Sequence, residues 1–202
     1  GKNVMTNDGV NHARRRFLTV ATTGVGIAGA GFVVTPFVGS WNPSAKAKSA
    51  GAPVKANISK IESGQMATFE WQGKPVYVVR RTPDMVSGLV KMTDALQDPD
   101  SLKSVQPLYC KNEHRSVKDA VFVVVGICTH LGCAPKYRPD VAPEDLGKDW
   151  IGGFFCPCHG SKFDLAGRVL KNVPAPTNLT VPAYHFDSDT VIVIGEDPKG
   201  AA

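Results

Sequence analysis

The feature that most constrains this 202-residue chain is an uncharged apolar segment near its N-terminus. No side chain from Phe17 to Ala45 carries a charge. As a helix at ~1.5 Å per residue, residues 17–41 would span ~37 Å, enough to cross a hydrocarbon core of ~30 Å. Glycines in this stretch weaken a soluble helix but are accepted inside a membrane. The sequence therefore predicts a transmembrane helix at residues 17–41 and a separate domain after it.

Three arginines, Arg14–Arg16, stand directly before this segment and are followed by Phe17 and Leu18. This arrangement resembles the twin-arginine signal, which exports proteins already folded around a cofactor. A weak A-x-A match at residues 45–47 would allow cleavage as an ordinary signal peptide. We expect retention, because the apolar run is longer than the core of a usual signal peptide. Residues 1–16 then form a cytoplasmic N-terminus, and everything after Trp41 lies outside.

The charge distribution argues against nucleic-acid binding. The formal net charge is +5, but residues 1–56 hold seven Lys/Arg against one Asp, and residues 57–202 hold sixteen against seventeen acidic residues. A basic end on a nearly neutral domain is typical of a membrane-insertion flank rather than a DNA-binding surface. Hydrophobic residues make up 43% and charged residues 20%, a globular composition that excludes wholesale disorder and collagen.

Residues 42–56 are small and polar with scattered Pro and Gly, so we expect a flexible hinge or linker without secondary structure. The outer domain is then expected at residues 57–202. Short β-rich runs predict strands there, and Thr82 followed by Pro83 predicts the start of a short helix. The strands are expected at residues 68–71, 75–79, 121–127, 151–155 and 190–194. No GxGxxG, P-loop or GxSxG motif and no internal repeat occurs.

Two short segments hold four of the five cysteines: 128–133 reads CTHLGC and 156–161 reads CPCHGS. Each follows an expected hydrophobic strand, so both are loops at strand ends, where a rigid scaffold can place ligands. Together they offer two cysteines and two histidines, in the spacings C-x-H and C-x₂-H, and one spare cysteine each. Cys110, the fifth, has no metal-ligand pattern near it and is expected to be an unpaired thiol.

Three kinds of site compete for this pattern. A structural zinc site usually pairs C-x₂₋₄-C with H-x₃₋₅-H rather than mixed pairs. A thiol–disulfide catalyst needs C-x-x-C at a helix N-terminus, which neither segment has. A Rieske 2Fe–2S centre replaces two cysteines by two histidines on one iron, and the two hexapeptides favour it. Thiolates favour Fe³⁺, so neutral imidazoles would raise the reduction potential of such a cluster.

With these motifs, the chain closely resembles the Rieske iron–sulfur subunits of bacterial ubiquinol–cytochrome c reductases, the cytochrome bc complexes. The resemblance covers the arginine motif, anchor, linker, β domain and both hexapeptides. It implies a mostly β fold: a Rieske-type antiparallel β-sandwich with a small cluster-binding subdomain and an N-terminal transmembrane helix. It also implies one 2Fe–2S cluster, whose buried iron is held by Cys128 and Cys156 and whose outer iron is held by His130 and His159. Cys133 and Cys158 would form a disulfide.

The resemblance implies the following function. The subunit takes an electron and a proton from ubiquinol at cytochrome b and passes the electron to a membrane-bound c-type cytochrome, contributing to the proton-motive force. His159 would contact the quinol, with His130 as the second exposed ligand, and Leu131 and Gly132 would form an apolar lip that docks on cytochrome b. The assembly would be a dimeric multi-subunit complex in the bacterial inner membrane, with this domain in the periplasm and swinging between two docking sites.

Further positions carry expectations of their own. Ser161 matches the family position whose hydroxyl donates a hydrogen bond to a bridging sulfide. Phe163 stands where many members of the family have Tyr, whose hydroxyl bonds a ligand sulfur, so we expect a lower reduction potential than in the relatives with Tyr. Residues 172–176 resemble a proline loop that covers the cluster, although a rigid surface turn explains them equally well. Residues 134–155 form a polar insertion, interpreted as a solvated excursion or, alternatively, as a docking surface for a partner subunit.

Three alternatives are weighed against this interpretation. The Rieske subunit of a periplasmic arsenite oxidase can share the export signal and the spare cysteine pair. A soluble Rieske ferredoxin or dioxygenase component needs neither anchor nor disulfide. A zinc-stabilised, non-redox binding domain would lack the electron paramagnetic resonance (EPR) signal of a His-ligated cluster.

Overall fold

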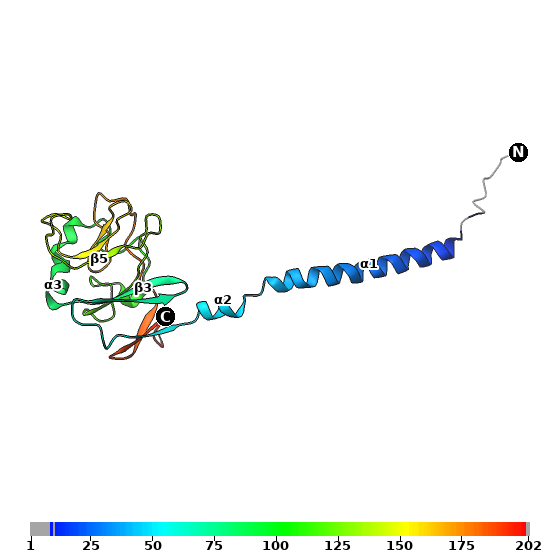
Figure 1. Cartoon of the computed structure of the whole chain (residues 1–202), viewed down its shortest axis with the longest axis horizontal. Coiled ribbons are helices and arrows are strands. Elements are labelled where there is room, and N and C mark those ends of the chain that lie inside the picture. The colour runs from blue at the N-terminus through cyan, green and yellow to red at the C-terminus, as the bar shows by residue number, and fades with distance from the viewer. Residues whose placement is uncertain (1–8, 10, 201–202) are drawn as a thin grey trace. The chain divides into compact units, whose positions relative to one another are not determined.

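A computed structural model describes residue 9 and residues 11–200 of the chain. The chain divides into two compact units, one ending at Lys48 and one beginning at Ser49 (Figure 1). The first contains a single long helix, and the second contains all the strands that the structure describes.

Helix α1 runs from His12 to Ser40 and has no buried side chain. It begins before the uncharged run, because the Asn11 side chain accepts a hydrogen bond from the backbone N–H of Arg14 (3.0 Å) and caps the helix. The three arginines thus lie in its first turns rather than before it. By length and composition α1 can cross a membrane, a criterion that a signal sequence also meets.

The segment expected as a structureless linker contains two short elements. Helix α2 spans Ala45–Ala50, and the Ser44 hydroxyl accepts a hydrogen bond from the N–H of Ala47 (3.1 Å). Strand β1 spans Val54–Asn57 and pairs with β9, Val191–Ile194, with Val54 opposite Ile194. The expectation of no structure from 54 to 56 was therefore wrong: β1 is held by a partner strand far away in the sequence, which local composition does not reveal.

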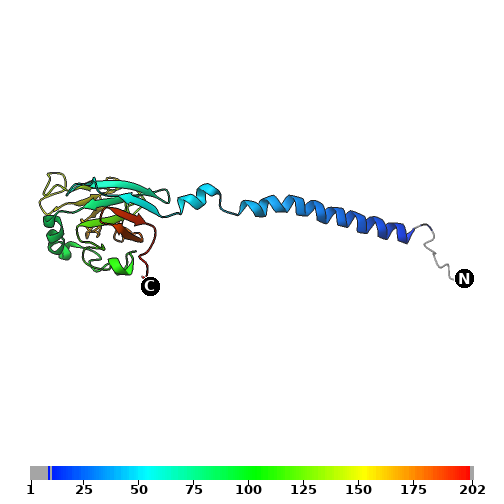
Figure 2. The same ribbon diagram turned by 90° about the horizontal axis from the view of Figure 1, so that it is seen from below.

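The second unit contains three antiparallel three-stranded sheets, which confirms the expected mostly β class. The first joins β1, β9 and β8 (Tyr184–Ser188). The second joins β2 (Met66–Trp71), β3 (Lys74–Arg80) and β4 (Val121–Val125). The third joins β5 (Lys136–Arg138), β6 (Gly153–Phe155) and β7 (Lys162–Phe163). In Figure 2 the orange-red strands β8 and β9 lie close to the cyan-green strands, as the β1–β9 pairing requires.

Helical elements complete the domain. Helix α3 spans Pro83–Lys91, and Thr82 caps it through its hydroxyl, as expected. Two short 3₁₀ helices follow, η1 at Thr93–Ala95 and η2 at Leu108–Cys110.

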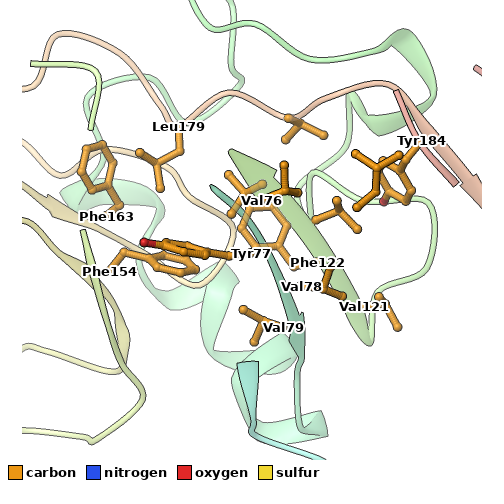
Figure 3. Packing of buried hydrophobic residues seen from close by; sticks show 14 of the residues in the cluster. Val76, Tyr77, Val78, Val79, Val121, Phe122, Phe154, Phe163, Leu179 and Tyr184 are labelled. Carbon is orange, nitrogen blue, oxygen red and sulfur yellow. The ribbon is translucent and has the colours of Figure 1, made fainter. Parts of the chain in front are cut away.

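An aromatic core connects the second sheet to the third. Figure 3 shows Tyr77 of β3 lying against Phe154 of β6, with ring centroids 6.1 Å apart and planes 10° from parallel. Phe154 also packs against Phe122 of β4 (6.2 Å) and is fully buried. Such aromatic pairs stabilise beyond the area they bury. The third sheet, which carries one of the two Cys/His segments, is thereby fixed to the rest of the domain.

Buried arginines hold the chain that follows β7. Arg115, with no exposed surface, donates to the carbonyl oxygens of Ala166 (3.1 Å) and Leu179 (2.8 Å). Arg168 is ion-paired with Asp164 at 2.7 Å, and both are almost fully buried. Arg115 satisfies loop carbonyls that have no strand partner, and Arg168 joins Asp164 to the carbonyl of Leu89 in α3, so the loop after β7 is held in one conformation.

Candidate metal centre

The two Cys/His segments form loops with the same backbone hydrogen bonds. In the first, the N–H of Cys128 donates to the carbonyl of Cys133 (2.8 Å) and the N–H of Gly132 donates to that of Cys128 (3.0 Å). In the second, Cys156 donates to Ser161 (2.8 Å) and Gly160 to Cys156 (3.0 Å). The glycine has a positive φ in each loop, 84° at Gly132 and 76° at Gly160, which explains a glycine at this position of both hexapeptides.

Each loop follows a strand end that has little freedom. The first loop follows β4, and a Cβ at Gly126 would overlap the ring of Tyr77. The second follows the three-residue strand β6, and a Cβ at Gly153, the first residue of that strand, would overlap the carbonyl oxygen of Phe163. Both glycines are therefore required by close packing, and the loops start from fixed points on two different sheets.

The cysteines expected as ligands meet at the base of the two loops. Cys128 and Cys156 are both free and buried, each with 2% of its surface exposed. Burial raises the pKa of the Cys128 thiol; the N–H of His130 and the hydroxyl of Ser161 oppose this, and the neighbouring Cys156 thiol adds to it. Two thiols this close favour losing their protons only when a cation binds between them.

The histidines of the two loops are nearer to solvent than this pair. The rings of His130 and His159 are 4.7 Å apart between centroids and nearly perpendicular, at 85°. The Nδ1 atom of His130 is buried and has no hydrogen-bond partner among the described residues. A buried polar atom without a partner is rare unless it binds something else. Two buried thiols, an unpartnered imidazole nitrogen and a second imidazole beside it form a donor set that fits a His-ligated 2Fe–2S cluster.

A disulfide joins the two loops. It links Cys133 to Cys158, as the resemblance implied, with their Cα atoms 6.7 Å apart. The sulfur of Cys156 lies within 4.8 Å of both disulfide sulfurs, so the bridge lies directly beside the thiol pair. The remaining cysteine, Cys110, is an unpaired, fully buried thiol in the core, and burial raises its pKa to about 11.

A third segment is tied to both loops. The N–H of Ala175 donates to the hydroxyl of Ser161 (3.1 Å), and the Thr129 hydroxyl donates to the carbonyl of Thr177 (2.7 Å). The segment at residues 172–176 is therefore attached to the second loop through Ala175, which fits both a loop that covers the centre and a rigid surface turn. Sequence reasoning missed the role of Thr129, because a threonine between two candidate ligands carries no signal of its own.

The tip of the two loops is exposed. Leu131 is 71% exposed, and His159 and Gly132 are also exposed. Phe163 is fully buried in the core below the centre. The insertion at 134–155 contains all of β5 and β6 and buries Trp150 and Leu146, so it contributes two strands to the third sheet.

Comparisons with known proteins identify the family of the chain. Residues 52–185 match the Rieske [2Fe-2S] domain, and residues 4–44 match a family described as the "Ubiquitinol-cytochrome C reductase Fe-S subunit TAT signal". The "Ubiquinol-cytochrome c reductase iron-sulfur subunit" of Allochromatium vinosum is 57% identical over 98% of this chain and 95% of its own length. The chain belongs to this family of Rieske iron–sulfur subunits. It accordingly binds a 2Fe–2S cluster.

A second curated relative gives the same result. The protein of the same name from Blastochloris viridis is 41% identical over 94% of this chain and 97% of its own length. A solved structure titled "Hyperthermophilic respiratory Complex III" covers 86% of this chain and 98% of that chain, at 23% identity and a TM-score of 0.48. The matches do not favour the arsenite-oxidase alternative.

Proposed function

We propose that this Rieske subunit takes one electron and one proton from ubiquinol at cytochrome b and passes the electron to cytochrome c1. The observation that carries the proposal is the pair of adjacent imidazoles at the tip of the loops, above two buried thiols. A donor set with histidines outside and cysteines inside gives a partner molecule access to the imidazole side only.

The roles of the metal-binding residues follow from burial. Cys128 and Cys156 would hold the inner iron, and His130 and His159 would hold the outer iron. When bound, the 2Fe–2S cluster supplies one-electron transfer at a raised potential. His130 has its unpartnered Nδ1 atom on the buried side, which supports binding through Nδ1 and leaves Nε2 facing outward. His159 is the more exposed of the two, so its Nε2 atom would accept the hydrogen bond and then the proton of the quinol.

Neighbouring residues would shape the docking tip. Leu131 is largely exposed and Gly132 lies beside it without a side chain, so together they would form a water-excluding lip against cytochrome b. Ser161 accepts a hydrogen bond from Ala175 and its hydroxyl also contacts the Cys128 thiol, so it would donate its proton toward the centre. The Cys133–Cys158 disulfide would keep the two ligand loops together in the oxidising periplasm.

The membrane arrangement is part of the proposal. Residues 1–16 would remain cytoplasmic, α1 would span the bacterial inner membrane and the β domain would lie in the periplasm. Residues 42–53 would serve as the hinge, since an isolated helix as short as α2 is marginal in water and can melt. The subunit would work in a dimeric complex with cytochrome b and the c-type cytochrome.

The test uses the assembled complex. His159→Gln should abolish the low-average-g EPR signal of the reduced cluster and quinol-dependent reduction of the c-type cytochrome, while the haem spectra stay unchanged. His185→Gln is the matched control, because His185 lies on β8 outside the centre, and it should keep both properties. An EPR-silent centre containing zinc in the unmodified protein would overturn the proposal.

A further inference from the structure

A pocket of about 820 Å³ lies directly beside the second ligand loop. Four stretches of chain line it: the end of α3 together with Met92 and Ala95, residues 146–151 of the insertion, Gly160 with Lys162, and residues 170–173. Gly160 is the residue after His159, so the rim of the pocket begins next to an exposed candidate ligand. A protein that docks on the histidine tip from this side therefore meets the pocket.

The charge of the pocket is strongly positive. Four lysines line it against one carboxylate, Asp149; they are Lys91, Lys148, Lys162 and Lys171. None of these lysines has an ion-pair partner among the described residues. An unbalanced cluster of ammonium groups on an otherwise nearly neutral domain attracts an anionic group.

Two of the four lysines are held in the walls of the pocket by hydrogen bonds to backbone carbonyls. Lys162 donates through Nζ to the carbonyl of Leu146 (3.1 Å), and Lys171 donates to that of Asp94 (2.8 Å). Lys91 and Lys148 are exposed and donate no side-chain hydrogen bond to a described residue. The pocket thus combines two lysines that shape it with two that remain available to a ligand.

The insertion forms a stiff wall of the pocket. Arg138 binds Asp140 and Asp145 through paired hydrogen bonds of 2.8 to 3.0 Å. Trp150 is 3% exposed, and its backbone carbonyl accepts a hydrogen bond from Ala142 (2.7 Å). A loop held in this way presents Lys148 in a defined position, and little ordering entropy is lost when a partner binds.

We propose that this pocket binds an acidic segment of the electron-accepting cytochrome while the histidine tip is docked on it. This inference rests on the proposed function. The apolar lip at Leu131, on the first loop, suits an apolar donor site in the membrane protein. The basic pocket, beside the second loop, suits a water-exposed acceptor, because exposed charges speed association and let a contact form and break in each turnover.

The test compares two double variants in the assembled complex. Lys91→Glu/Lys148→Glu reverses the two available charges, and Lys60→Glu/Lys74→Glu makes the same change at lysines that do not line the pocket. After rapid reduction of the cluster, transfer to the c-type haem should slow on the order of tenfold in the pocket variant at low salt. The deficit should shrink to less than about twofold near 1 M salt, where charges are screened beyond about 3 Å. The neutral pair Lys91→Gln/Lys148→Gln should give a smaller deficit.

Four further outcomes separate the explanations. The midpoint potential and EPR spectrum must be unchanged in the pocket variants, which shows that the centre itself is intact. Equal rates in the pocket and control variants, with a normally active unmodified complex, would overturn the pocket and leave the proposed function standing. A deficit that vanishes in nanodiscs of neutral lipid would assign the pocket to a lipid headgroup and overturn it as well. Failure of the unmodified complex to reduce the c-type haem would overturn both proposals.

Discussion

Removal of the Cys133–Cys158 disulfide tests how the two ligand loops are held together. The two cysteines are separated by 25 positions in the sequence. A loop of that length loses about 12 cal/mol/K of unfolded-state entropy on cross-linking, which corresponds to about 3.5 kcal/mol at 25 °C. The double variant Cys133→Ser/Cys158→Ser should therefore unfold with a free energy lower by about 3 kcal/mol. Replacing both cysteines avoids a lone thiol next to Cys156, which could form a non-native disulfide.

The rate at which the cluster is lost measures the effect of the disulfide at the site itself. All four candidate ligands remain in the variant, so the visible spectrum should form normally. Cluster loss under an iron chelator should be faster by roughly a hundredfold, because about 2.7 kcal/mol of that stabilisation opposes separation of the loops. Cys110→Ala, which removes a buried cysteine outside the centre, should leave this rate unchanged. An unfolding free energy within about 1 kcal/mol of the unmodified protein, with unchanged cluster loss, would refute the reasoning.

Three other perturbations have defined outcomes. Phe163→Tyr adds a buried hydroxyl that can donate a hydrogen bond to the centre. If this hydrogen bond is roughly 1 kcal/mol stronger in the reduced state, the midpoint potential of the cluster should rise by about 40 mV in a redox titration. An unchanged midpoint potential would contradict the role expected for this position. Burial would raise the pKa of Asp98, but hydrogen bonds from Ser104 and two backbone N–H groups outweigh it and lower that pKa. The stability that Asp98 contributes is therefore fully present at pH values above its ordinary pKa of 3.8 and is lost as the pH falls below that value. Asp98→Asn should lower the free energy of unfolding by ~1–3 kcal/mol at neutral pH and reduce the loss of stability at acidic pH, measured by denaturant unfolding over a pH series. Prolines inserted between Ala45 and Ala52 should slow turnover of the complex at an unchanged midpoint, and unchanged turnover would count against a moving domain.

The sequence predicted the ligand loops because their structure is local. Each hexapeptide closes on itself through hydrogen bonds between its first and sixth residues and has glycine where φ is positive. Strand β1 was not predicted, because Val54 is ordered by Ile194, 140 positions away, and nothing in residues 42–56 encodes that partner. The basic pocket was also missed, since its four lysines come from segments up to 80 positions apart.

Buried arginines were the least predictable feature, and the reason is physical. Arginine is almost always exposed, so a sequence pattern assigns Arg115 to the surface. In the structure it is fully buried because the segment after β7 has carbonyl groups with no strand partner, and a guanidinium offers five N–H donors in a fixed geometry. The Arg115 guanidinium thereby supplies the hydrogen-bond donors that a neighbouring strand would otherwise provide. The same segment continues from the second ligand loop through β7, so the chain that leaves this loop is held by a contact that no local sequence pattern predicts.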